Sequence, residues 1–142
     1  MFSRIKKFPR YKHLKWLAFH DTLTGLYNRN WLHYNMDYVK HRYVYFIDLN
    51  DLKKINEKGH TYGDRYIQDV ILRLGLSLPP EDILVRYAGD EFILFSDTLD
   101  IVETNKIYSV GNCELDLYPI EECINIADGV MMKNKINFKT KR

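Results

Sequence analysis

Two short apolar runs separated by an acidic turn constrain the fold of this chain more than any other feature. The runs ILVRY at 83–87 and FILF at 92–95 flank the four residues AGDE at 88–91. Runs of β-branched and aromatic residues on both sides of a short turn predict a β-hairpin. Within the turn, Gly89 is expected to adopt a backbone conformation that other residues resist.

The remaining patterns predict further strands and several helices. A β-branched and aromatic run at 43–47 predicts a buried strand, which ends in a second acidic turn, DLND, at 48–51. Apolar residues at helical spacing predict the clearest helix at 63–78, where two prolines end it. We also expect helices at 3–19 (interrupted at Pro9), 29–40, 52–58 and 119–132, and two short strands at 106–110 and 114–118. This order is typical of an α+β fold, in which helices pack on one face of a mainly antiparallel sheet.

The 142 residues fit a single domain. We expect a basic helical lead at 1–20 and one domain at 21–142. No run approaches the roughly 18 apolar residues of a membrane span, and the N-terminus lacks the pattern of a signal peptide. Two cysteines, Cys113 and Cys123, form neither a disulfide framework nor a zinc pattern. A reduced, cytoplasmic protein is therefore expected.

The formal net charge of +2 hides an uneven distribution. Residues 1–16 carry six basic side chains and 133–142 carry five, without an acid in either segment, so all 19 acids lie between them beside ten bases. Clustered acids favour metal ions, and basic ends favour phosphate or another anionic surface. A purely solvating role for both ends is the alternative, and nucleic acid is not expected as a partner.

Three acids stand where predicted strands meet turns: Asp48, Asp90 and Glu91. If the strands are neighbours, these carboxylates converge at one edge of the sheet, where they repel one another unless a divalent cation lies among them. Such a set suits Mg²⁺, and two such ions can promote phosphoryl transfer. The alternative is that the acids are simply solvated.

Five blocks, in order, are similar to the motifs of GGDEF domains, the diguanylate cyclase family. DTLTGLYNR at 21–29 is similar to DxLTGLxNR, and RYAGDEF at 86–92 resembles the signature hairpin. The other blocks are DLNDLKKIN at 48–56 with Gly59-His60 and Gly63-Asp64, SVG at 109–111, and Ala127-Asp128 followed by Lys135. The resemblance implies a palm-like fold of the class III nucleotidyl cyclase (ferredoxin-like) type.

The same resemblance implies an activity and a set of site residues. Two GTP molecules would be joined into cyclic di-GMP across a homodimer, with release of two pyrophosphates and with two Mg²⁺ or Mn²⁺ ions in each active site. Asp48, Asp90 and the carbonyl of Leu49 would bind metal, and Glu91 would assist catalysis. The implied substrate-binding residues are the amides of Asp51, Leu52 and Lys53 with Lys135 and Lys139 for phosphates, Asn56 and Asp64 for guanine, and His60, expected to order the loop rather than transfer a proton.

Three substitutions near the site depart from the family pattern: Ala88, Asn50 and Leu52. Ala88 replaces the first glycine of the signature, and activity is expected to survive because the acids are intact. Asn50 replaces the second acid of the DxD motif and is expected to turn away from the metal edge. Of the RxxD pair for product inhibition, the window 79–82 retains just Asp82, so we expect no tight feedback by cyclic di-GMP.

The chain is also short for the family. Residues 96–106 leave room for a turn or two where the family carries a helix, so this helix is expected to be shortened or missing and one sheet face less covered. Twenty residues before 21 cannot form a sensor domain. Control is therefore expected to come from expression, the N-terminal helix or a regulatory protein partner.

Two other functions remain open at this stage. The first is a catalytically inactive GGDEF module that binds GTP, a cyclic dinucleotide or a protein, which Ala88 and the missing helix favour. The second is a palm-type cyclase or polymerase with another nucleotide product, which the basic ends favour.

Overall fold

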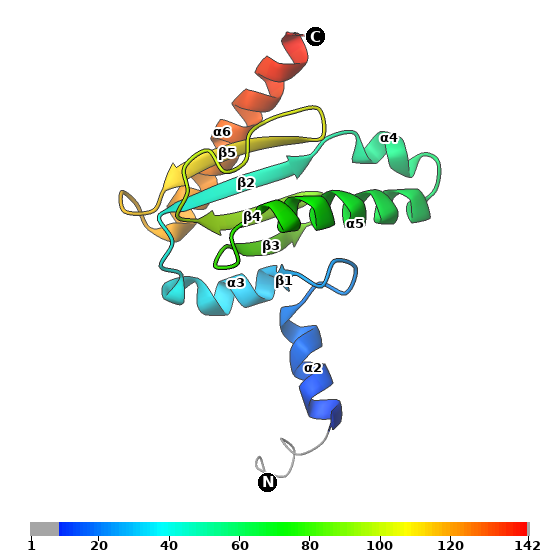
Figure 1. The fold of residues 1–142 in the computed structure, drawn as a ribbon, viewed down its shortest axis with the longest axis vertical. Helices are drawn as coiled ribbons and strands as arrows, with labels where there is room; N and C mark the ends of the chain where they lie inside the picture. Colours follow the sequence, from blue (N-terminus) through cyan, green and yellow to red (C-terminus); the bar gives the residue numbers. More distant parts are fainter. Residues whose placement is uncertain (1–8, 142) are drawn as a thin grey trace.

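The computed structural model describes residues 9–141, so the part of the predicted lead at 3–8 lies outside the described residues. A helix begins at Pro9, where the sequence predicted an interruption. The elements in chain order are α2 (Pro9–Phe19), β1 (Tyr27–Asn28), α3 (Arg29–Asn35), the 3-10 helix η1 (Met36–Tyr38), β2 (Tyr43–Leu49), α4 (Leu52–Asn56), α5 (His60–Ser77), β3 (Ile83–Ala88), β4 (Glu91–Ser96), β5 (Tyr108–Glu114) and α6 (Ile120–Thr140) (Figure 1).

The described strands form one sheet in the order β1-β3-β4-β2-β5. β2 pairs antiparallel with both β4 and β5, β3 pairs antiparallel with β4, and the two-residue β1 runs parallel to β3. The predicted hairpin is therefore present as β3 and β4, next to the predicted strand β2. The α+β fold class and its mainly antiparallel sheet are confirmed.

Helices cover both faces of this sheet, so the prediction of helices on one face is wrong (Figure 1). Successive strand residues point to opposite faces, and in β2 both sets are buried. Tyr45 and Ile47 pack in the cluster that includes α5. Val44 and Phe46 pack in the cluster that includes α3 and α6. A strand that is apolar at every position requires apolar cover on each side.

Residues 97–107, which we name the β4–β5 connection, contain no helix, as predicted. The sheet face is nevertheless covered here, because Val102 is 6% exposed and belongs to the same cluster as α5. The Tyr45 hydroxyl donates to the carbonyl of Thr98 at 2.6 Å. Asn50 Nδ2 donates to the carbonyls of Asn105 and Lys106 at 3.1 and 3.3 Å. The expected bare face is thus filled by an extended, hydrogen-bonded segment.

The predicted pair of strands at 106–110 and 114–118 is wrong, because one strand, β5, runs without interruption past Gly111. A Cβ atom on Gly111 would lie 2.2 Å from the carbonyl oxygen of Ala127 and 2.2 Å from the amide nitrogen of Met131. This glycine therefore lets α6 approach the strand and does not mark a turn. α6 itself continues to Thr140, beyond the predicted end at 132, and contains most of the basic tail.

Within residues 9–141, no helix is both long enough and apolar enough to cross a bilayer.

Candidate active site

The three predicted acids lie together at one end of the central strands. Asp48 is directly opposite Glu91 in the antiparallel pairing of β2 and β4. The next amide along β2, that of Leu49, donates to the carbonyl of Asp90 at 2.9 Å, which fixes the hairpin tip against the end of β2. Asp48 is 6% exposed, and Asp90 and Glu91 are half-buried. The predicted convergence of these residues is therefore present.

The electrostatics of this cluster favour a cation. Burial raises the pKa of Asp48, and the neighbouring charges of Asp90 and Asp128 raise it further, while a hydrogen bond from Lys135 opposes them. Burial likewise raises the pKa of Glu91, followed by the charges of Asp48, Asp90 and Asp128. Carboxylates that raise each other's pKa are stabilised as anions by a positive charge placed among them.

Lys135 places such a charge at the cluster. Its Nζ donates to Oδ2 of Asp48, which forms an ion pair between α6 and β2. Lys135 and Lys139 also line a small hollow together with Asp51. The two lysines that were predicted to bind phosphate therefore lie beside the turn at Asp51, whose amides were predicted to bind phosphate as well.

The acids fit a divalent cation in donor chemistry, although the described residues show no preformed group of three or more His, Cys, Asp or Glu ligands. Two hard carboxylates from adjacent strand ends, Asp48 and Asp90, are ligands that Mg²⁺ prefers, and this ion retains several waters. Lys135 forms an ion pair with Asp48, and no ion pair among residues 9–141 involves Asp90 or Glu91.

The hairpin tip is held by a contact that sequence reasoning missed. Arg86 donates through Nη1 to both carboxylate oxygens of Asp21, at 3.0 and 3.1 Å. It also donates through Nε and Nη2 to the carbonyl of Gly89, at 3.2 and 2.9 Å. The side chain of Asp21 in turn accepts from the amide and hydroxyl of Thr24. One arginine therefore connects the 21–29 block to the residue that precedes Asp90.

Burial would raise the pKa of Asp21, but hydrogen bonds from Thr24 and Arg86 outweigh it and leave the pKa below its usual value. The signal available in the sequence was the joint presence of Asp21 and Arg86 in two motif blocks, to which no contact had been assigned.

The backbone at the hairpin tip differs from the expectation for Gly89. The described residues with positive φ are Gly25, Gly59, Asp51 and Asp100, so the prediction of a special backbone conformation at Gly89 is wrong. The turn lies at Gly89 and Asp90, and the pairing of β3 with β4 shifts register between Arg86 and Ala88, just before it. A Cβ on Gly89 would meet no atom within 4 Å, which leaves open space for a ligand to approach the tip.

The residues predicted to bind guanine lie at the junction of α4 and α5, at the same end of the sheet as the hairpin tip (Figure 1). The half-buried Asn56 lies over Gly63, since a Cβ there would be 1.7 Å from Asn56 Oδ1. His60 and Asp64 are exposed in the first turns of α5. The absence of a side chain at Gly63 therefore leaves the space that Asn56 fills.

The predicted phosphate turn begins at Asp51, which has φ of 63° at the start of α4. Leu52 is buried among the residues packed around α5, so its amide is the group that can contact a ligand. Lys53 is exposed. The Asn50 side chain is bound to β5 and to the β4–β5 connection, and its Oδ1 accepts from the Ser109 hydroxyl at 2.9 Å.

The remaining residue of the RxxD window is directed into the protein. Oδ2 of Asp82 is buried and has no hydrogen-bond partner among residues 9–141. Burial raises the pKa of Asp82, although Ser96 and His41 oppose the shift. Asp82 is half-buried as a residue, and the window 79–82 contains no arginine to pair with it.

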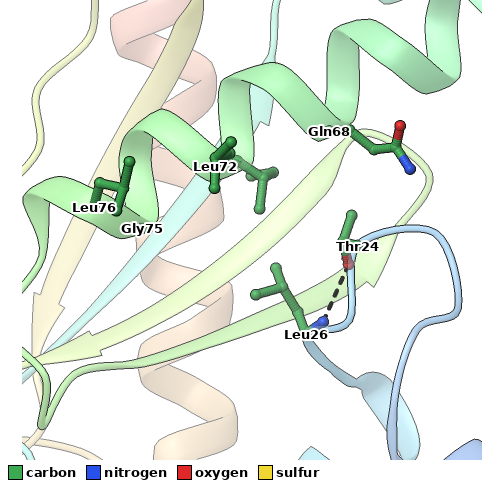
Figure 2. A pocket seen from close by; sticks show the side chains of 7 residues that line it. Thr24, Leu26, Gln68, Leu72, Gly75 and Leu76 are labelled. Carbon is green, nitrogen blue, oxygen red and sulfur yellow. Dashed lines mark hydrogen bonds between the residues drawn. The ribbon is translucent and has the colours of Figure 1, made fainter.

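An apolar pocket of about 430 Å³ lies elsewhere, between the 21–29 block and α5 (Figure 2). Its lining has no acid, and the amide of Leu26 donates to the Thr24 hydroxyl on one wall. Leu72 and Leu76 rise from α5 on the other wall and are 63% and 80% exposed. This pocket is separate from the acid cluster.

The sequence was compared with known protein families. The sequence model described as "Diguanylate cyclase, GGDEF domain" matches residues 18–109. The chain belongs to the GGDEF family. The resemblance inferred from the five sequence blocks is confirmed.

Relatives of this GGDEF chain carry different names. The response regulator PleD of Caulobacter vibrioides is 32% identical over 111 residues, covering 68% of this chain and 24% of PleD. The cyclic di-GMP phosphodiesterase NbdA of Pseudomonas aeruginosa is 36% identical over 95 residues, covering 59% of this chain and 12% of NbdA. A solved microbial GGDEF domain, described for its interaction with cyclic di-GMP, has a TM-score of 0.73 and 26% identity, covering 87% of this chain and 94% of that one.

The GGDEF chain spans less than a quarter of the length of PleD and of NbdA. Its membership of the family and its fold are therefore established, whereas its own reaction has to be argued from its site.

Proposed function

We propose that this protein is a diguanylate cyclase. In the proposed reaction, the 3′-hydroxyl oxygen of each GTP attacks the α-phosphorus of the other, the bond to the β-phosphate breaks, and two pyrophosphates leave as cyclic di-GMP forms. The observation that carries the proposal is the register of Asp48 against Glu91, with Asp90 fixed beside them at the hairpin tip. Membership of the family and the relation to PleD support it.

The substrate is proposed to lie between the acids and the α4–α5 junction. Asp64 can accept hydrogen bonds from both the ring N–H and the exocyclic amine of guanine, and adenine lacks this pair of donors. Asn56 supplies a second polar group at the guanine edge, and His60 orders the loop around it. The amides of Asp51, Leu52 and Lys53 are proposed to bind phosphate, because the first amides of a helix lack partners within the helix.

Asp48 and Asp90, with the carbonyl of Leu49, are the residues that would hold Mg²⁺ or Mn²⁺, two ions in each active site. When bound, these ions would neutralise phosphate charge and favour the alkoxide form of the attacking hydroxyl. Glu91 would then position that hydroxyl. Lys135, no longer required as the sole counter-charge of Asp48, would bind the triphosphate together with Lys139.

Each copy of the chain carries one such half-site, so catalysis requires two copies facing each other. The protein is proposed to act in the cytoplasm as this homodimer, without product inhibition at the 79–82 window, and under the control of a regulatory protein partner.

The test is product analysis by mass after incubation with GTP and Mg²⁺. Asp90→Asn should abolish cyclic di-GMP formation, because it removes a carboxylate charge without changing the shape of the side chain. Asp69→Asn, at an exposed position of α5, is the matched control and should leave the reaction unchanged. Equal turnover by wild type and Asp90→Asn would refute the role of the acid cluster.

Two results would favour the other functions. Wild-type protein that binds GTP but forms no product at any concentration would indicate a binding module. A mixed or linear nucleotide formed from GTP and ATP together would indicate a different cyclase or polymerase.

A further inference from the structure

The two cysteines of the chain lie against each other in the structure. Cys113 is near the end of β5, and Cys123 is in the first turn of α6. Their Sγ atoms are 3.1 Å apart, and both thiols are free. Both lie within reach of one acceptor, the carbonyl of Glu114, at 3.7 Å from Cys113 Sγ and 3.4 Å from Cys123 Sγ. Neither thiol takes part in the proposed reaction.

We propose that Cys113 and Cys123 are a modification site, at which a peroxide forms a reversible disulfide that ties α6 to the sheet. A disulfide has an S–S distance of about 2.05 Å, so the sulfurs need to approach by about 1 Å. They are ten residues apart in sequence and face each other across one strand–helix contact. A side-chain rotation within that contact can bring them together.

The environment of each thiol indicates which of the two sulfurs reacts with peroxide first. Cys113 is 7% exposed on the outermost strand of the sheet, whereas Cys123 is 0% exposed. Burial, and then the neighbouring Cys113, raise the pKa of Cys123 to about 12, so this thiol stays protonated at neutral pH. Cys113 is therefore the sulfur that a peroxide reaches first.

The chemistry balances with the peroxide as the oxidant. The Cys113 thiolate attacks one peroxide oxygen, the O–O bond breaks, and a sulfenic acid and hydroxide form. The Cys123 sulfur then attacks the sulfenic sulfur, the S–O bond breaks, and water leaves as Cys123 loses its proton. The net change is two thiols and one hydrogen peroxide giving one disulfide and two waters.

The disulfide would act on the helix that carries part of the proposed active site. Asp128 and Lys135 follow Cys123 in α6. The helix already packs closely on β5 at Gly111. A covalent bond at the first turn would prevent this helix from leaving the sheet, and a closed loop in the unfolded chain raises stability. We expect the melting temperature of the oxidised protein to rise by roughly 10 °C.

The test compares the reduced and the peroxide-treated 142-residue chain, without GTP. Treatment should remove about 2 Da from the intact mass as two hydrogens leave. It should also protect both cysteines from alkylation after denaturation and yield a peptide pair linked through Cys113 and Cys123. Dithiothreitol should restore the original mass, alkylation and melting temperature. Because these readouts use the wild-type chain and no nucleotide, they are independent of the proposed cyclase activity.

Cys123→Ala is the control, because it retains the first sulfur and lacks the second. This variant should show neither the 2 Da loss nor the rise in melting temperature within the monomer. Sulfinic acid on Cys113 of wild type, a gain of about 32 Da, without any linked peptide would overturn the proposal. Unreacted thiols after prolonged treatment would overturn it equally.

Discussion

Replacing Gly111 with alanine tests how closely α6 is seated on the sheet. The added Cβ would lie 2.2 Å from backbone atoms of both Ala127 and Met131, where ordinary contacts begin at 3.4 Å. The helix would therefore have to retreat by about 1.2 Å, because backbone atoms cannot rotate away as a side chain does. Overpacking a core costs about 1–3 kcal/mol. We expect Gly111→Ala to lower the free energy of unfolding by about 3 kcal/mol, at the upper end of this range.

The assay is equilibrium unfolding in urea, followed by circular dichroism. With a slope of about 2 kcal/mol per molar, a loss of 3 kcal/mol moves the midpoint down by roughly 1.5 M. Gly129→Ala is the matched control in α6, because a Cβ there meets nothing within 4 Å and the position is exposed. Alanine should raise stability there by up to about 1 kcal/mol through helix propensity. If Gly111→Ala unfolds at the wild-type midpoint with an unchanged slope, the close packing of α6 on β5 is refuted.

Three further substitutions address single contacts. Asp21→Asn removes the ion pair with Arg86 and should lower stability at neutral pH by about 1–2 kcal/mol. The pKa of Asp21 is lower in the folded state than its usual value of 3.8. In wild type, the stability that Asp21 contributes should therefore be lost as the pH falls below 3.8 and through the folded-state pKa, which unfolding measured over a pH series would show. The variant should show no such loss. Gly63→Ala should displace the Asn56 side chain and so raise KM for GTP. The midpoint of urea unfolding should change little, because the Asn56 side chain is flexible and can move aside. An unchanged KM would argue against Asn56 at the guanine edge. Asn50→Asp loses both amide donors to the β4–β5 connection and should speed hydrogen exchange in that segment, and unchanged exchange would show that these bonds do not hold it.

The acid cluster was predictable because it depends on local sequence patterns, namely a hairpin turn and a strand that ends in an acid. A hairpin has its turn at one end, and a strand paired with that hairpin brings its own terminal acid to the same edge. The order of the motif blocks then gave the family. The reason for expecting Asn50 to turn away from the metal edge was wrong, because Asp48 and Asn50 are two residues apart and strand alternation places such residues on the same side. Hydrogen bonds with Ser109 and with the β4–β5 connection hold the Asn50 side chain instead.

The errors came from contacts between distant segments. In the sequence, Gly111 suggests a break between two strands. In the structure it allows the backbone of α6 to pack closely on β5, and that helix begins nine residues later. Polar residues after 132 hide the continuation of that helix, which is held on β5 by a hydrogen bond from Asn134 Nδ2 to the Val110 carbonyl at 2.8 Å. The continuous apolar run of β2 did contain the signal for helices on both faces, but the expectation from the fold class was followed instead.

The ion pair between Lys135 and Asp48 could not be predicted either, because 87 residues separate its partners. Sequence reasoning assigned Lys135 to phosphate and Asp48 to metal, and the structure brings the two charges together. The arrangement makes physical sense, because a buried carboxylate requires a counter-charge.

The central claim is that two copies of this acid cluster join two GTP molecules. Mass-resolved product analysis with GTP and Mg²⁺ over a series of protein concentrations tests it most directly. The expected product is cyclic di-GMP, formed at a rate that rises faster than linearly with protein concentration because each copy supplies half of the site. GTP that remains intact at the highest concentration, or product whose rate per protein molecule stays constant across the series, would contradict it.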